Sequence, residues 1–180
     1  STSVGGNSKT LKLDALSLVR IMISSDHHDA SIVKDALSEI LLPELCRSVE
    51  EDWYKVIAEA LRVLAEIPLL LATSTDKAER DQVASSLCSA ILPRLAAHDL
   101  DQEIKECALT ASSTLLSVLH ESLMEDQKNE ILKLLQERLA NETTRIAAIK
   151  TLSVIAADNK GTKVDLSPIL ADTVSELASL

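Results

Sequence analysis

Apolar residues recur along this chain at intervals of three and four, the spacing that places them on one face of a helix. The clearest run comprises Trp53, Val56, Ile57, Ala60, Leu61 and Leu64. The same periodicity predicts helices over residues 9–25, 31–49, 53–71, 79–97, 102–119, 125–139 and 143–157, and a last helix from residue 167. A β-sandwich or a doubly wound sheet needs more glycine turns and more aromatic and β-branched runs, and this chain has 3 glycines and no phenylalanine. We therefore expect an all-α fold.

The predicted helices form a repeat. Residues 40–45, 90–95 and, more loosely, 134–139 are similar apolar segments late in a first helix, and each is followed by a short acidic stretch and a second helix. A two-helix unit recurring at roughly 40 to 50 residues is typical of a HEAT or armadillo solenoid. We expect residues 1–8 to be a flexible lead. Residues 9–180 are then one α-solenoid segment with about three complete helix pairs and half a pair at each end, excised from a longer solenoid.

Prolines and acidic residues mark the expected helix boundaries. Pro43 and Pro93 fall inside first helices, where each removes a backbone hydrogen bond and is expected to bend the helix. The expected N-caps are Asp52, then Asp99 or Asp101, and finally Ser167, with Pro168 at the first helical position.

Charge and cysteine content narrow the function. The formal net charge is −10 and is spread evenly over both halves, so no basic stripe is present to bind nucleic acid or an anionic membrane. The most apolar stretch is interrupted by Arg62, Glu66 and Pro68, so we expect no membrane span. Three cysteines without a paired motif are expected to be reduced, buried thiols of a cytoplasmic or nuclear protein.

No residue cluster predicts chemistry. His27 and His28 are adjacent and point apart, so a polar turn is favoured over a metal site. His98 and His120 lie near the C-terminal ends of helices, where they are expected to cap the terminal carbonyls or to interact favourably with the helix dipole. The acidic pairs before second helices suit capping better than acid–base catalysis, and no common catalytic motif occurs. We expect no enzyme activity, no cofactor and no metal.

Two further groups of residues have competing structural and functional interpretations. Trp53 lies in the apolar stripe and is expected to be buried between neighbouring units. Lys55, Lys105 and Arg145 each lie near the start of a second helix. A ladder of contacts to acidic residues of the next unit is favoured over partner binding for these three.

The candidate partner-binding surface is the polar face of the second helices, which line the concave side of a HEAT stack. Its residues are Lys55, Glu59, Arg62 and Glu66 on one helix, and Glu103, Glu106, Thr110 and Ser113 on the next. These residues form no large apolar patch, so one repeat is expected to contribute little affinity and binding requires many linked contacts.

Five segments, residues 11–17, 53–61, 101–108, 137–146 and 164–170, occur in the order and spacing of one family. They resemble the central HEAT region of the cullin-associated and neddylation-dissociated (TIP120) family. The resemblance implies a non-enzymatic, monomeric scaffold section that binds a cullin–RING complex lacking its ubiquitin-like modifier and promotes exchange of substrate receptors. The alternatives are a segment of an importin-β-type transport receptor and a phosphatase-type HEAT scaffold.

Overall fold

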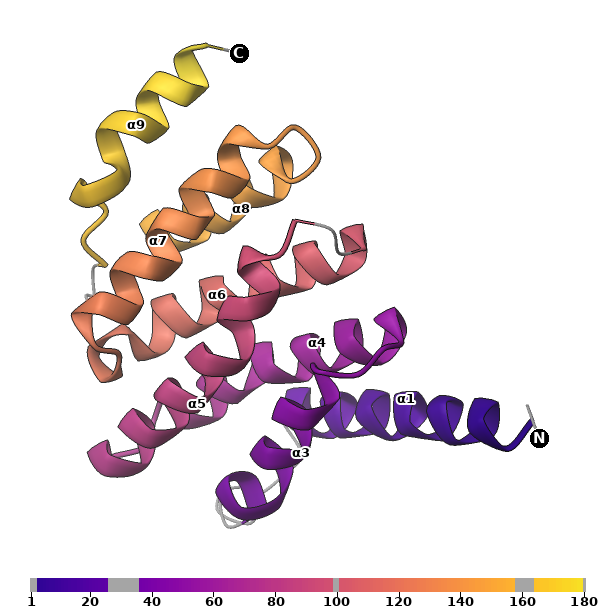
Figure 1. Ribbon diagram of the computed structural model, residues 1–180. Coiled ribbons are helices and arrows are strands. Elements are labelled where there is room, and N and C mark those ends of the chain that lie inside the picture. The colour runs from indigo at the N-terminus through magenta and orange to yellow at the C-terminus, as the bar shows by residue number, and fades with distance from the viewer. Residues whose placement is uncertain (1–2, 26–35, 99–100, 158–163, 180) are drawn as a thin grey trace.

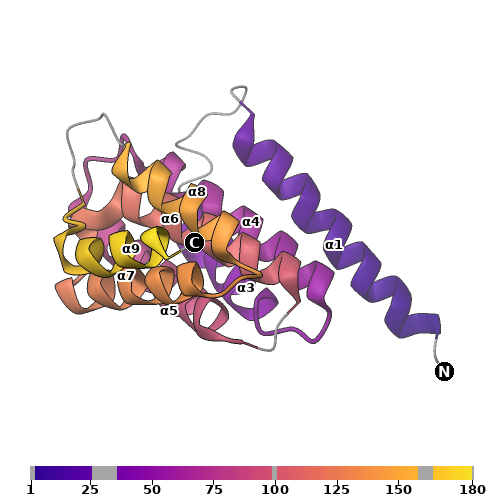
Figure 2. The ribbon, with the colours of Figure 1, turned by 90° about the horizontal axis from the view of Figure 1, so that it is seen from above.

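The computed structural model describes residues 3–25, 36–98, 101–157 and 164–179, and these residues form helices in two layers, with no strand (Figure 1). One layer contains α1 (Ser3–Ser24), α4 (Tyr54–Leu71), α6 (Gln102–Leu119) and α8 (Arg145–Ala156). The other contains α3 (Leu42–Ser48), α5 (Lys77–Ala96), α7 (Glu125–Ala140) and α9 (Ser167–Ala178). The helices α3–α4, α5–α6 and α7–α8 are consecutive pairs that follow one another along the stack (Figure 1). The view from above shows the layer of α4, α6 and α8 beside the layer of α5, α7 and α9 (Figure 2). The expected all-α stack of helix pairs is confirmed.

The second helices α4 and α6 form the centre of the core. Helix α4 packs against α1 on one side and α6 on the other, and α6 packs in turn against α8. Because α4 is covered on both sides and by its paired helix α3, most of its apolar residues are excluded from water, including Leu61, Leu64, Ile67 and Leu71 at 0% exposure. Each such side chain stabilises the fold by about 1.5–3 kcal/mol through burial.

Pro43 lies in a stretch whose backbone stays helical but changes from a π-helical turn to an α-helix. A π-helical turn, Leu37–Leu41, ends where α3 begins, and Pro43 occupies the first turn of α3. The Leu42 N–H bonds to Leu37 O across the π-helical turn, and prolines and π-helical turns are both common sites of helix bending. Pro93, in contrast, lies inside α5, which continues through it. The predicted helix start at residue 31 lies outside the described residues.

Two of the predicted caps are wrong. Trp53, and not Asp52, is the N-cap residue of α4, and no side chain accepts a hydrogen bond there. Helix α9 begins at Ser167 itself, and Asp165 accepts the Ser167 N–H at 2.9 Å, so the capping oxygen comes from two residues upstream. Asp101 does cap α6, because its carboxylate accepts the Glu103 N–H at 2.8 Å.

The helix α1 begins earlier than expected. It starts at Ser3, within the segment that the sequence predicts to be a flexible lead. Two glycines in this segment disfavour a helix by about 1 kcal/mol each, but no proline interrupts it, and extending an existing helix adds one hydrogen bond for each residue fixed.

Candidate functional site

Glu59, which the sequence places on the partner-binding face, is buried. Its side chain is on α4 at 4% residue exposure, and its carboxylate accepts hydrogen bonds from Arg20 Nε at 2.7 Å and from an Arg62 terminal nitrogen at 3.0 Å. A side chain held between two guanidinium groups and excluded from solvent has no surface to offer a partner. The prediction that Glu59 faces outward on this surface is therefore wrong.

The same interaction continues into the next repeat. Arg62 also donates to Glu103 Oε1 of α6 at 2.5 Å, so Arg20, Glu59, Arg62 and Glu103 form one chain of alternating charges across α1, α4 and α6. We call these four residues the ion ladder. Charged hydrogen bonds are stronger than neutral ones, and a buried carboxylate requires such partners. Three of the eight residues predicted for the partner-binding surface, Glu59, Arg62 and Glu103, are thus bonded within the stack.

Burial and charge act in opposite directions on the ion ladder. Burial raises the pKa of Glu59, but the hydrogen bonds from Arg20 and Arg62 outweigh it and hold the pKa below the ordinary 4.5. Burial lowers the pKa of Arg62, but the carboxylates of Glu103 and Glu59 raise it by more, so the pKa lies above its ordinary value. Both groups therefore stay charged at neutral pH.

The three basic residues near the starts of second helices behave differently from one another. Arg145 donates to the carbonyls of Leu139 and Ala140 at 3.1 Å each and approaches Glu176 of α9 at 3.7 Å, so its expected role in tying units together is confirmed. Lys55 lies about 6 Å from the rings of Trp53 and Tyr54 and is exposed. Lys105 makes no ion pair within the described part of the chain.

Trp53 is only partly buried, contrary to the expectation of a core residue. As the N-cap residue of α4 it lies outside the helical stripe and packs at the edge of the core. The apolar spacing that suggested burial assumed a helix that began one residue earlier.

Arg138 is a structural residue that the sequence analysis missed. It is 2% exposed, and its guanidinium donates to the carbonyls of Leu95 and Ala97 at 2.8 Å each. These carbonyls end α5 and have no partner within that helix, so Arg138 ties α7 to the preceding first helix. The similarity of residues 90–95 and 134–139 gave the only signal, since both contain an arginine at the same place.

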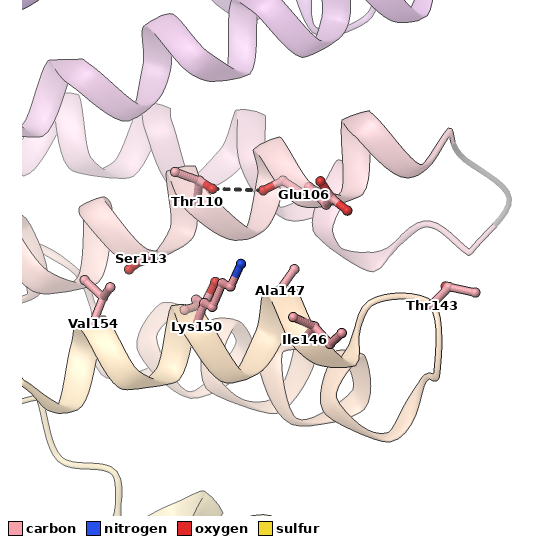
Figure 3. Close-up of a pocket in the computed structure, with 9 residues that line it drawn as sticks. Glu106, Thr110, Ser113, Thr143, Ile146, Ala147, Lys150 and Val154 are labelled. Atoms are coloured by element: carbon pink, nitrogen blue, oxygen red, sulfur yellow. Dashed lines mark hydrogen bonds between the residues drawn. The ribbon is translucent and has the colours of Figure 1, made fainter.

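A groove of about 410 Å³ lies between α6 and α8 on the second-helix layer. Figure 3 shows Glu106, Thr110 and Ser113 on its α6 side and Ile146, Lys150 and Val154 on its α8 side. Glu106, Thr110 and Ser113 belong to the surface predicted from the sequence. Ser113, however, is 5% exposed and lies at the floor of the groove, whereas Glu106 is exposed at its edge.

The remaining expectations concern chemistry. Cys88 and Cys107 are buried and Cys46 is partly buried, and all three are free thiols. Burial raises the pKa of both Cys88 and Cys107 to about 11. Among the described residues no three metal-ligating side chains lie close enough to hold an ion, and no helix there has the length and apolar character to cross a membrane. His27 and His28 lie outside the described residues.

Comparison with known proteins decides the family. Residues 1–112 match a family model described as CAND1-like, TPR repeats. The chain belongs to this CAND1-like family. It is 32% identical over 173 residues to "Cullin-associated NEDD8-dissociated protein 1" of Arabidopsis thaliana. The aligned residues cover 95% of the chain and 14% of that relative. It is also 34% identical over 175 residues to "Cullin-associated NEDD8-dissociated protein 2" of Rattus norvegicus, over 96% of the chain and 13% of the relative.

These matches confirm the resemblance noted in the sequence and fix its extent. A third relative, the Dictyostelium discoideum "Cullin-associated NEDD8-dissociated protein 1", is 27% identical over 99% of the chain and 14% of its own length. The chain thus spans about one seventh of the curated CAND relatives it matches, and it corresponds to a repeat segment of a family that is generally not catalytic.

Proposed function

We propose that this CAND-family segment is a non-enzymatic scaffold section that contacts a cullin–RING complex lacking its ubiquitin-like modifier. In this role it supports exchange of substrate receptors in the cytoplasm or nucleus. The single observation that carries the proposal is the similarity of nearly the whole chain to proteins named for their association with cullins. Family membership disfavours the importin-β-type and phosphatase-type alternatives, and the chain acts as a monomer in this proposal.

The contact surface that we propose is the second-helix layer, with its residues revised by the structure. Lys55 and Glu106 are exposed and Glu66 is half-buried, so their charges are available to a partner. Arg62 and Glu103 already bond each other, and Glu59 is covered. Because few charged side chains remain for each helix, each repeat contributes a small part of the affinity, and the isolated chain binds weakly.

Nuclear magnetic resonance suits this test, because the chain is 19.5 kDa and the method detects weak binding. The isotope-labelled chain is titrated with a purified cullin–RING complex that lacks the modifier, and then with the modified complex. We expect amide signals of α4, α6 and α8 to weaken with the unmodified complex only. Attenuation confined to α3, α5 and α7 would contradict the proposed surface, and no attenuation at all would contradict the proposed function.

A charge reversal adds a matched comparison. Lys55→Glu removes an exposed cation from α4, whereas Lys133→Glu makes the same change on the exposed surface of α7 in the other layer. We expect the first to weaken binding and the second to leave it unchanged. Equal effects of both variants would indicate non-specific attraction to the charge of the chain and not a contact by α4.

A further inference from the structure

The groove between α6 and α8 has a specific origin in the repeat. Setting Tyr54 of α4 against Gln102 of α6 places every buried residue of α6 opposite a buried residue of α4. Setting Gln102 against Ile146 of α8 places every buried residue of α8 opposite a buried residue of α6. The second helices therefore share one burial pattern, and equivalent positions can be compared from one boundary to the next.

In this alignment the ion pair of one boundary is replaced by two short side chains at the next. Arg62 of α4 corresponds to Thr110 of α6, and Glu103 of α6 corresponds to Ala147 of α8. Arg62 and Glu103 bridge α4 and α6, leaving a hollow of about 280 Å³ beside them. Thr110 instead donates to the Glu106 carbonyl of its own helix at 3.0 Å, as the dashed line in Figure 3 shows. Within the described residues no ion pair joins α6 to α8, and the larger groove of about 410 Å³ occupies this place.

The walls of this groove have the character of a binding surface. Ile146 and Val154 are 70% and 55% exposed and lie two helical turns apart on α8, with Lys150 between them (Figure 3). On the floor, the Ser113 hydroxyl is buried and has no hydrogen-bond partner.

The charged side chains at the groove determine which charge a binding partner needs. Glu106 accepts a hydrogen bond from the Gln102 amide at 2.9 Å, whereas Lys150 makes no ion pair with any described residue. Among the described residues that line the groove, Lys150 is therefore the cation that is available to a partner's carboxylate. A partner that suits this wall carries an acidic residue between two apolar ones.

We propose that the groove between α6 and α8 docks an amphipathic helix of a protein partner. The helix places apolar side chains against Ile146 and Val154 and a carboxylate against Lys150. These two apolar contacts lie about 12 Å apart along α8, which two turns of a docked helix also span. The inference rests on the proposed function, since it names the kind of segment through which a cullin–RING complex contacts this region.

A helix fits better than an extended peptide because of hydrogen bonding. An extended peptide leaves its backbone N–H and C=O groups to be satisfied by the groove, for which side-chain amides are well suited. No asparagine or glutamine lines this groove, and the backbones of α6 and α8 are occupied within their own helices. A docked helix satisfies its own backbone and needs only side-chain contacts.

The decisive variant closes the groove with the residues of the preceding boundary. Thr110→Arg together with Ala147→Glu reproduces the Arg62–Glu103 pair and leaves Ile146 and Val154 in place. A second variant, Ile146→Thr with Val154→Thr, removes the apolar contacts while changing only exposed residues. Ile40→Thr, at 66% exposure on the π-helical turn, is the matched surface control.

Two probes are titrated into the chain with isotope-labelled isoleucine and valine methyl groups. One is the unmodified cullin–RING complex. The other is a synthetic helical peptide of about 18 residues with leucines two turns apart and a glutamate midway, since shorter peptides are poorly helical. We expect the Ile146 and Val154 methyl signals to respond to both probes. Each double variant should weaken binding about tenfold or more, and Ile40→Thr should leave it unchanged, with circular dichroism confirming equal helix content.

The outcomes separate the two proposals. If the cullin–RING complex attenuates the second-helix layer but both double variants bind within twofold of the unaltered chain, the groove is not the docking site and the proposed function stands. If the peptide occupies the groove and the cullin–RING complex has no effect, the groove inference holds and the proposed function fails. A chain that responds to neither probe overturns both.

Discussion

The ion ladder predicts an unusual reversal in mutational effects. Glu59 has two cationic partners, Arg20 and Arg62, and each can be replaced by methionine, which keeps most of the side-chain volume. A hydrogen bond to a charged group contributes about 1.5–3 kcal/mol. The Arg20 and Arg62 side chains are 35% and 38% exposed, so solvent screening reduces this contribution. We expect each single variant to lower the free energy of unfolding by about 1–2 kcal/mol, because the other arginine still compensates Glu59.

Removing both arginines should have a larger effect on the free energy of unfolding. The Glu59 carboxylate, at 4% residue exposure, then has no cation beside it, and an uncompensated buried charge costs about 3–5 kcal/mol. Glu59→Leu should then stabilise the double variant, because it removes that charge. In the unaltered chain the same Glu59→Leu change should be destabilising by about 1–2 kcal/mol, since it removes two charged hydrogen bonds. The sign of one substitution thus depends on the other two residues.

The dependence of stability on pH should reverse in the same way. The pKa of Glu59 is lowered in the folded chain, so its contribution is present above the ordinary pKa of 4.5 and is lost as pH falls through the folded-state value. Without the two arginines, burial raises the Glu59 pKa instead. The double variant should therefore gain relative stability as the pH falls through the raised folded-state value toward the ordinary 4.5.

Urea unfolding, followed by helical circular dichroism and by Trp53 fluorescence, measures these free energies. Coincident transitions are required, because a stack of repeats can unfold in parts. The control is Arg47→Met, which removes a pair with Glu44 whose side chains are 67% and 52% exposed, and it should change stability by less than about 0.5 kcal/mol. If Glu59→Leu destabilises both backgrounds equally, Glu59 is not the buried, arginine-compensated charge described here.

Three further outcomes test other parts of the structure. Arg138→Met should cost about 2–4 kcal/mol in urea unfolding, because two carbonyls at the end of α5 lose their donor; a loss under about 0.5 kcal/mol would contradict this role. Trp53→Ala should cost about 1–2 kcal/mol, less than a full core tryptophan, and a loss above about 3 kcal/mol would show deeper burial. At mildly alkaline pH a thiol reagent should modify Cys46 faster than Cys88 and Cys107, whose thiol pKa is about 11; equal rates in the folded chain would contradict their burial.

The helices and their pairing were predictable because they depend on a periodic pattern. Apolar spacing located the second helices α4 and α6 to within a residue, since a long stripe of buried side chains leaves little freedom in register. The boundaries were less certain. Asp52 and Trp53 are both compatible with a helix start, and the choice depends on local backbone angles that neither residue type determines.

The function of individual charges was not predictable in this way. Helical periodicity places Glu59 opposite the apolar stripe of its own helix, where a charged residue normally faces water. In a stack, that side of α4 is covered by α1, whose Arg20 supplies the compensating charge. Burial of Glu59 therefore depends on a residue in the preceding repeat, which the pattern of a single helix does not contain.

The ion ladder and the groove together suggest how such a surface divides its side chains. Where Arg62 meets Glu103, the charges of two neighbouring repeats are used to hold the stack together. One boundary later, Thr110 and Ala147 occupy the equivalent positions and cannot form that bond. Beside them Lys150 has no ion-pair partner among the described residues, and Ile146 is exposed. A charge in a helical repeat is thus available to a partner only where the adjacent repeat lacks its complement. This rule places the candidate contact between α6 and α8, and it also explains why Glu59 and Arg62, although they fit the expected polar face, serve the stack instead.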